Sequence, residues 1–120
     1  MDIKERGEVF ALLLAEQLKD AVKNAGYTQR EVAKKVGSSG KQINMYLNGV
    51  RTLPADFYSR ICAAIERDPI KIVDDAYQAL QDVETGKRPD PRIIPIWKLA
   101  AKDPGYSARE QAEEEENNQP

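Results

Sequence analysis

Apolar residues recur every three or four positions over most of the first 84 residues, which predicts a helical protein. The first predicted helix covers residues 3–25 and ends before Gly26, because glycine commonly follows the last turn of a helix. The apolar stripe of this helix contains Val9 or Phe10, Leu13, Leu14, Leu18 and Val22.

Two more helices are predicted after residue 53. Pro54 suits the first turn of a helix that runs to about Arg67. Asp68 and Pro69 match an N-cap followed by proline at the first helical position, so the last helix runs from there to about Glu84. The residues expected to be buried are Phe57, Ile61, Ala64 and Ile65 in the first of these helices and Ile70, Val73, Ala76, Tyr77 and Leu80 in the second.

Residues 28–37 predict a short helix with clear boundaries. Thr28 is a favourable N-cap and Glu31 follows three positions later, which is the spacing of a capping box. The inward positions are Val32, Ala33 and Val36, and Ala33 is small enough for a second helix to approach closely. Gly37 ends the helix because glycine tolerates the left-handed conformation.

A second short helix follows, capped by Ser38 or Ser39 and ended by Asn48 and Gly49. Ile43, Tyr46 and Leu47 recur at helical spacing and should face the core. The two short helices together read as a helix-turn-helix over residues 28–48, whose second helix is sized for the major groove of DNA. The side chains expected on its outer face are Ser39, Lys41, Gln42, Asn44, Met45 and Asn48.

These patterns predict an all-α fold of five helices and divide the chain into three parts. Residues 1–86 form the helical domain, and residues 87–107 form a linker that carries an apolar cluster at 93–97. This cluster packs either on the helical domain or on a partner chain, because exposed apolar clusters mark contact sites. Residues 108–120 form an acidic tail that is expected to be disordered and to keep the protein soluble.

The net charge of −2 hides an uneven distribution. Residues 19–60 contain eight basic and three acidic residues, whereas residues 108–120 contain one basic and five acidic residues. Positive charge is therefore concentrated on the helix-turn-helix, as expected for a surface that contacts phosphates.

The composition argues against other classes of protein. The chain has no histidine and one cysteine, so neither a usual metal site nor a histidine general base is available, and we expect no enzyme activity and no cofactor. Cys62 lies between apolar neighbours in a helical pattern and is expected to be a buried structural thiol. The chain has no apolar run long enough to span a bilayer and no signal-peptide pattern, so a cytoplasmic protein is expected.

The outer face of the second short helix carries the side chains suited to reading bases. Lysine donates to guanine, asparagine or glutamine pairs with adenine, and methionine contacts a thymine methyl group. Lys41 and Asn44 rank first because the N-terminal half of a recognition helix reads most bases. A phosphate contact is expected from Gln29, with looser ones from Lys34, Lys35 and Arg51. The full predicted DNA-binding set is Thr28, Gln29, Ser38, Ser39, Gly40, Lys41, Gln42, Asn44, Met45, Asn48 and Arg51.

The segment 10–68 resembles the lambda-repressor-like, or XRE, family of phage repressor and Cro proteins. Gln29 matches the glutamine that opens the first motif helix of that family. Gly40 departs from the pattern, since the family often has a long polar base-reading side chain there, and that contact passes to Lys41 or is lost. The remaining matches are the core pairs Val32-Ala33 and Val36-Gly37, Ile43, and the closing segment Tyr46-Leu47-Asn48-Gly49.

The resemblance implies a sequence-specific transcription regulator, a phage or prophage repressor that binds double-stranded operator DNA in a bacterial host. One recognition helix reads few base pairs, so a homodimer on two half-sites is expected, although a monomer remains possible. The dimer surface is expected on the fifth helix, the 93–97 cluster or the first helix. The alternative is an antitoxin-like module whose C-terminal half binds a partner protein.

Overall fold

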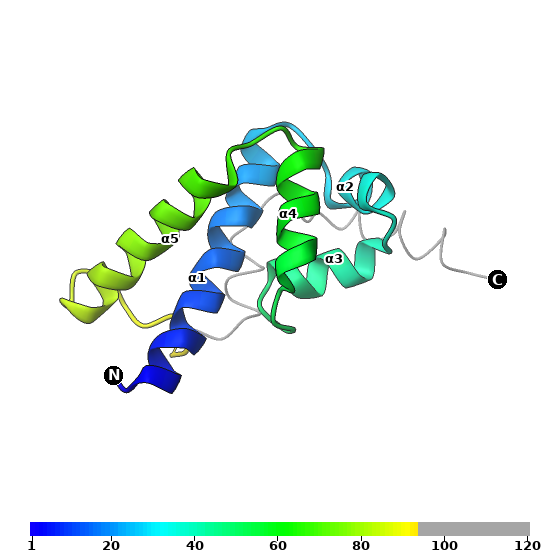
Figure 1. Ribbon diagram of the computed structural model, residues 1–120. Coiled ribbons are helices and arrows are strands. Elements are labelled where there is room, and N and C mark those ends of the chain that lie inside the picture. The colour runs from blue at the N-terminus through cyan, green and yellow to red at the C-terminus, as the bar shows by residue number, and fades with distance from the viewer. Residues whose placement is uncertain (94–120) are drawn as a thin grey trace.

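The computed structural model describes residues 1–93, and this part of the chain forms five helices and no strand (Figure 1). The predicted all-α fold is confirmed. Residues 94–120, which include most of the predicted linker and all of the acidic tail, lie outside the described residues. The same residues belong to the C-terminal half to which the antitoxin-like alternative assigns a partner. The helices are α1 (Ile3–Asn24), α2 (Gln29–Val36), α3 (Gly40–Leu47), α4 (Ala55–Ala64) and α5 (Pro69–Glu84).

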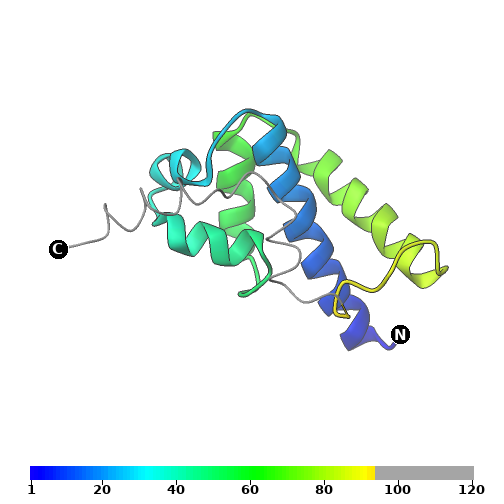
Figure 2. The same ribbon diagram turned by 180° about the vertical axis from the view of Figure 1, so that it is seen from behind.

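The long helix α1 runs through the centre of the molecule. The side chain of Asp2 accepts a hydrogen bond from the backbone N–H of Glu5 and so caps its first turn. α5 lies alongside α1 on one side, and α2, α3 and α4 lie together on the other (Figures 1 and 2). Because α1 contacts both groups, it fixes the position of the helix-turn-helix relative to α5.

Two clusters of buried side chains hold the helices together. One lies where α1 meets α5 and is built around Val9, Leu13 and Leu80. The other lies under the helix-turn-helix and joins α1, α2, α3 and α4, with Ile72 of α5 at its edge. The fully buried or nearly buried members of this second cluster are Leu18, Val22, Val32, Ala33, Ile43, Leu47, Ile61, Cys62, Ile65 and Ile72.

The predicted buried face of α5 is partly wrong. Ala76 and Leu80 are buried as expected, but Ile70, Val73 and Tyr77 are 76, 37 and 41% exposed. The helix packs instead through a stripe of Ile72, Ala76, Ala79 and Leu80. Two small alanines in this stripe let α5 approach α1 closely, and this packing leaves three larger apolar side chains on the surface.

α4 is shorter than predicted. It ends at Ala64 rather than near Arg67, because Glu66 has a left-handed backbone with φ of 57° that an α-helix cannot continue. Ile61 and Ile65 are buried as expected, whereas Phe57 and Ala64 are only partly buried. Cys62 is 1% exposed, which confirms the predicted buried thiol, and burial raises its pKa.

Charged pairs fasten the last described residues to α1. Arg88 pairs with Glu16, and Arg92 pairs with Glu5 at 3.1 Å. Pro91 between them is buried. Figure 2 shows this segment crossing beside the N-terminal half of α1, so the chain reaches residue 93 at a defined place on the helical domain.

Among residues 1–93, none of the helices combines the length and the apolar character that a membrane span requires.

Candidate nucleic-acid interface

Local sequence signals position α2 and the turn after it. The Thr28 side chain accepts from the backbone N–H of Glu31, and the Glu31 carboxylate accepts from the backbone N–H of Thr28, both at 3.1 Å. This is the predicted capping box. Gly37 has φ of 74° and ends α2 in the left-handed conformation, which an L-residue would adopt only with strain. The chain thus turns sharply into α3.

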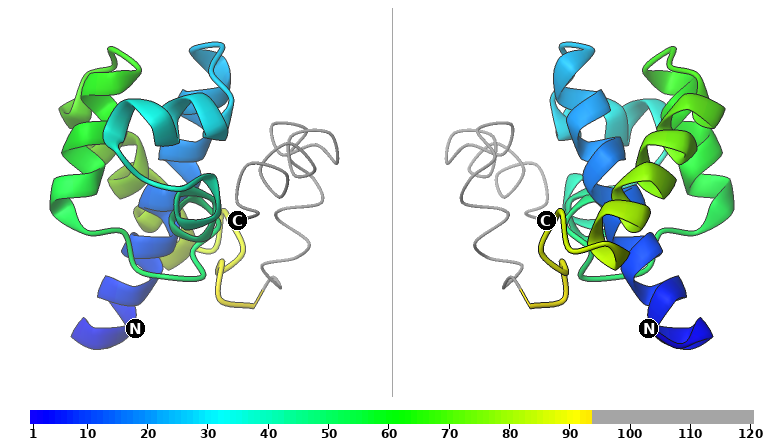
Figure 3. Two further views of the ribbon diagram at one scale, coloured as in Figure 1. Left: turned by 90° about the vertical axis from the view of Figure 1, so that its right-hand side faces the viewer. Right: turned by 90° about the vertical axis from the view of Figure 1, so that its left-hand side faces the viewer.

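Ser39, rather than Ser38, is the N-cap of α3, since its hydroxyl accepts from the backbone N–H of Gln42 at 3.1 Å. α3 crosses α2 on the same side of the molecule (Figure 3, left). Its inner face is held by Ile43, Tyr46 and Leu47, which are at most 7% exposed. The opposite face is therefore directed away from the core.

The outer face of α3 is only partly open. Ser39 and Lys41 are exposed, whereas Gly40, Asn44 and Met45 are half-buried. Lys41 is the cation on this face of α3. Of the two residues ranked first, Lys41 is exposed in the N-terminal half of α3, whereas Asn44 is half-buried in its middle. Their roles as base readers stay predictions.

Gln29 does not lie free at the start of α2. It is 3% exposed, and its side-chain oxygen accepts a hydrogen bond of 3.0 Å from the amide of Asn44. The pair links the first residue of α2 to the middle of α3. Gln29 can thus hold the Asn44 amide in one orientation, with its carbonyl oxygen left as an acceptor. The phosphate contact expected of Gln29 stays a prediction that this burial does not favour.

Gln42 is held in a small network on the flank of α3. Its side-chain oxygen accepts from the hydroxyl of Ser38, and its amide donates to the Tyr46 hydroxyl at 3.1 Å. Tyr46 in turn lies against Phe57 of α4, with ring centroids 5.2 Å apart. Both ends of the Gln42 amide therefore already have partners within the protein.

Asn48 was expected on the outer face, and this placement is wrong. The residue is 9% exposed, and its side-chain oxygen accepts a hydrogen bond from the ammonium of Lys19 in α1. Lys19 is itself 7% exposed. Sequence reasoning missed Lys19, although it follows Leu18 and precedes Val22 by three positions, on the inward side of α1. The pair anchors the C-terminal end of α3 to the central helix.

Replacing Asn48 by alanine should therefore lower stability rather than remove a DNA contact. Lys19 would lose one buried acceptor, at a cost of about 1–3 kcal/mol in the free energy of unfolding. Urea denaturation measures this loss, with Asn24→Ala at the exposed end of α1 as the control. Unchanged stability together with weaker binding to operator and scrambled DNA alike would instead show that Asn48 contacts phosphate.

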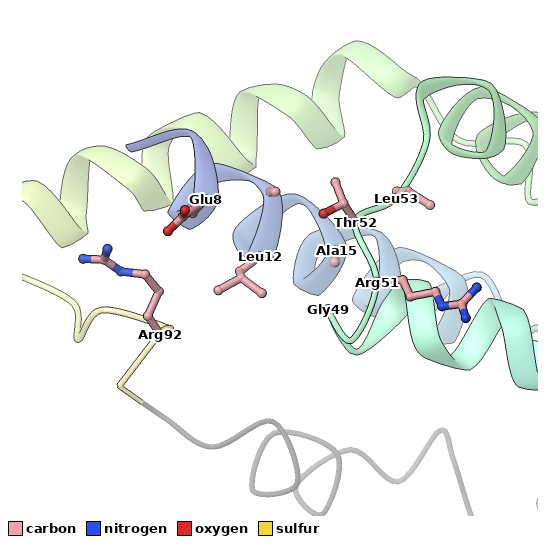
Figure 4. Close-up of a pocket in the computed structure, with 9 residues that line it drawn as sticks. Glu8, Leu12, Ala15, Gly49, Arg51, Thr52, Leu53 and Arg92 are labelled. Atoms are coloured by element: carbon pink, nitrogen blue, oxygen red, sulfur yellow. The ribbon is translucent and has the colours of Figure 1, made fainter. Parts of the chain in front are cut away.

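Basic side chains surround the motif. Arg51 is exposed in the loop after α3 (Figure 4), and Lys34 is exposed on α2. The Lys35 ammonium donates to the Tyr27 hydroxyl at 3.2 Å and to the backbone carbonyl of Ala64 at 3.3 Å. Lys35 therefore ties α2 to α4, and Arg51 and Lys34 are the more accessible of the predicted phosphate-contacting residues.

Two short helices joined through a left-handed glycine turn, with the second helix packed on one side and open on the other, define a helix-turn-helix DNA-binding domain. Residues 18–72 match the model of a helix-turn-helix family of the lambda-repressor-like, or XRE, type. The match supports a DNA-binding transcription regulator of the XRE type, and the matched family is not typically enzymatic. No curated protein and no solved structure matches the chain.

Proposed function

We propose that the protein is a sequence-specific repressor, similar to phage immunity repressors and Cro proteins, that covers operator DNA with α3 in the major groove. The observation that carries the proposal is the outer face of α3, which presents Lys41 while the inner face is packed on the domain. The major groove, about 12 Å wide, admits one helix. Such a repressor would act in the cytoplasm of a bacterial host.

Base reading is divided among three side chains of α3. Lys41 donates to guanine O6 and N7, and Asn44 pairs with adenine N6 and N7 while Gln29 orients it. Met45 contacts a thymine methyl group. Gly40 contributes no side chain, so the backbone can approach the DNA closely at the start of the helix.

Phosphate contacts fix the register of the domain on the duplex. Arg51 and Lys34 provide exposed cations, and Thr28, Ser38 and Ser39 lie at the N-terminal ends of α2 and α3, where backbone N–H groups favour anions. The excess of positive charge between residues 19 and 60 supports this orientation. Gln42 can contact DNA only if it gives up its hydrogen bonds to Ser38 and Tyr46.

Selection of bound sites from random duplex DNA tests the function directly. A repressor of this type should enrich one short sequence, and its affinity should fall steeply with salt, by a slope of about 0.9 for each neutralised phosphate. Lysine-rich proteins also bind DNA without sequence preference, so the control is the affinity for a scrambled duplex at the same salt concentration. Equal affinity for both duplexes, or no binding at low ionic strength, contradicts the proposal.

A homodimer on two half-sites is part of the proposal, and α5 offers a surface for it. Ile70, Val73 and Tyr77 lie at helical spacing on its exposed side. Beside them, a hollow of about 310 Å³ opens between α1 and α5, where Gly7 has no side chain and Phe10 and Ile3 form the wall. In a two-fold dimer the same patch serves both copies, so an apolar stripe next to an apolar hollow is self-complementary.

Substituting Val73 by glutamate should dissociate the proposed dimer. A charge buried in the interface lacks a partner, which strongly disfavours association, so sedimentation should show monomers at concentrations where the unmodified protein is dimeric. Gln78→Glu adds the same charge on an exposed side of α5 away from the stripe and serves as the control. Dimers that persist in Val73→Glu would place the interface elsewhere.

A further inference from the structure

A groove lies on the side of α1 away from α5. Its volume is about 220 Å³, and its floor is formed by Ala11, Leu12 and Ala15 of α1 (Figure 4). The opposite wall is the loop that follows α3, with Gly49 and Leu53. Small residues at three of these positions leave the space open, and the floor is apolar.

The chain itself arrives at one end of this groove. Arg92 lines the groove, and its side chain is held by Asp90 at 2.7 Å and by Glu5 at 3.1 Å. The Arg92 guanidinium also holds the pKa of Asp90 below its usual range, so both partners stay charged at neutral pH. The next residue, Ile93, is 78% exposed. The point from which the chain continues is thus fixed at the groove by named contacts.

The residues that follow have the chemistry and the length to fill the groove. In sequence they are Ile94, Pro95, Ile96 and Trp97, of which three have large apolar side chains. Four extended residues reach about 13–14 Å. The floor from Glu8 to Ala15 is about 10 Å long, since a helix rises 1.5 Å per residue.

We propose that residues 94–97 of the same chain occupy the groove between α1 and the loop after α3. The contact would continue the established attachment of residues 88–92 to α1 and would bury apolar side chains that otherwise face water. It would also place the C-terminal extension against the loop that carries Arg51, so that the extension braces the segment directly after the recognition helix. The docking itself does not depend on the DNA-binding proposal.

Trp97 is the one tryptophan of the chain and reports on the groove directly. In the full-length protein its emission should be blue-shifted and protected from acrylamide compared with the urea-unfolded protein, and independent of protein concentration. Ala11→Glu places a charge on the groove floor, so it should shift the emission to the red and raise quenching to the unfolded value. Ala63→Glu, on an exposed part of α4, should change neither.

A second measurement guards against a variant that merely unfolds. Circular dichroism must show that the Ala11→Glu protein is folded. The losses in Tm from Ala11→Glu and Ile96→Ser should not add in the double variant, because each substitution breaks the same contact. Emission that matches the unfolded protein before any substitution overturns the proposal, as does emission unaffected by Ala11→Glu. A blue shift that appears only at high concentration overturns it in favour of a second copy.

Discussion

Replacing Lys41 by alanine is expected to weaken binding to the selected operator by about 1–3 kcal/mol, which is roughly a 5- to 150-fold rise in Kd. The reason is that Lys41 lies exposed in the N-terminal half of α3, where a long cationic side chain can donate to a guanine edge. The measurement is a titration of the operator and of a scrambled duplex at one salt concentration. The loss should be smaller on the scrambled duplex.

Asn44→Ala should likewise weaken binding to the operator more than binding to the scrambled duplex, and Gln29→Ala should cause part of the same loss. Because the Gln29 carbonyl oxygen orients the Asn44 amide, the two losses should not add in the double variant. Lys34→Ala is the matched control, because the loss of a phosphate contact should weaken binding to both duplexes equally and lower the salt slope by about 1. If Lys41→Ala also weakens binding to both duplexes equally, Lys41 does not read a base.

Replacing Gly49 by alanine is expected to destabilise the helical domain more than the same change at Gly86. Both glycines are left-handed, with φ of 72° and 76°, so both variants lose about 1–2 kcal/mol to backbone strain. At Gly49 the added Cβ would lie 2.6 Å from the Cδ2 atom of Leu12, whereas nothing lies within 4 Å at Gly86. This crowding adds a further cost of up to about 1–3 kcal/mol.

Urea denaturation of the two variants isolates the steric part of this loss. Leu12 has a flexible side chain that can move aside, which sets the lower end of the expected difference. Adding Leu12→Ala to Gly49→Ala should remove most of the steric cost of the Gly49 substitution. Equal losses at Gly49 and Gly86 would mean that the Leu12 side chain or the loop after α3 moves aside at no cost. That result would also weaken the case for a fixed groove wall.

Sequence reasoning predicted the elements whose signals are local. The capping box of Thr28 and Glu31, the glycine turn at Gly37 and the start of α5 at Asp68 and Pro69 depend on residues within four positions of one another. Such signals survive in the folded chain because the hydrogen bonds they make are made within the helix end itself. The inward positions of α3 followed in the same way from its spacing.

The predictions of burial were wrong where contacts with residues distant in the sequence decide which side chains are buried. α5 carries two apolar stripes that share Ala76 and Leu80, and only its packing on α1 selects the stripe with the small residues. The burial of Asn48 depends on Lys19, 29 positions earlier in the chain. A polar side chain at the end of an amphipathic helix is normally exposed, so no local pattern predicts such a pair. The roles of the outer residues of α3 remain predictions.

The hydrogen bonds that Asn44 and Asn48 make limit how this protein could acquire a new target sequence. One pair fastens the middle of α3 to α2 through Gln29, and the other fastens its end to α1 through Lys19. Substitutions at these positions would disturb the docking of the helix as well as its contacts. Retargeting should therefore proceed through positions 40, 41 and 45, because Gly40, Lys41 and Met45 take part in neither hydrogen bond. A library confined to these three codons should yield folded variants with altered operators.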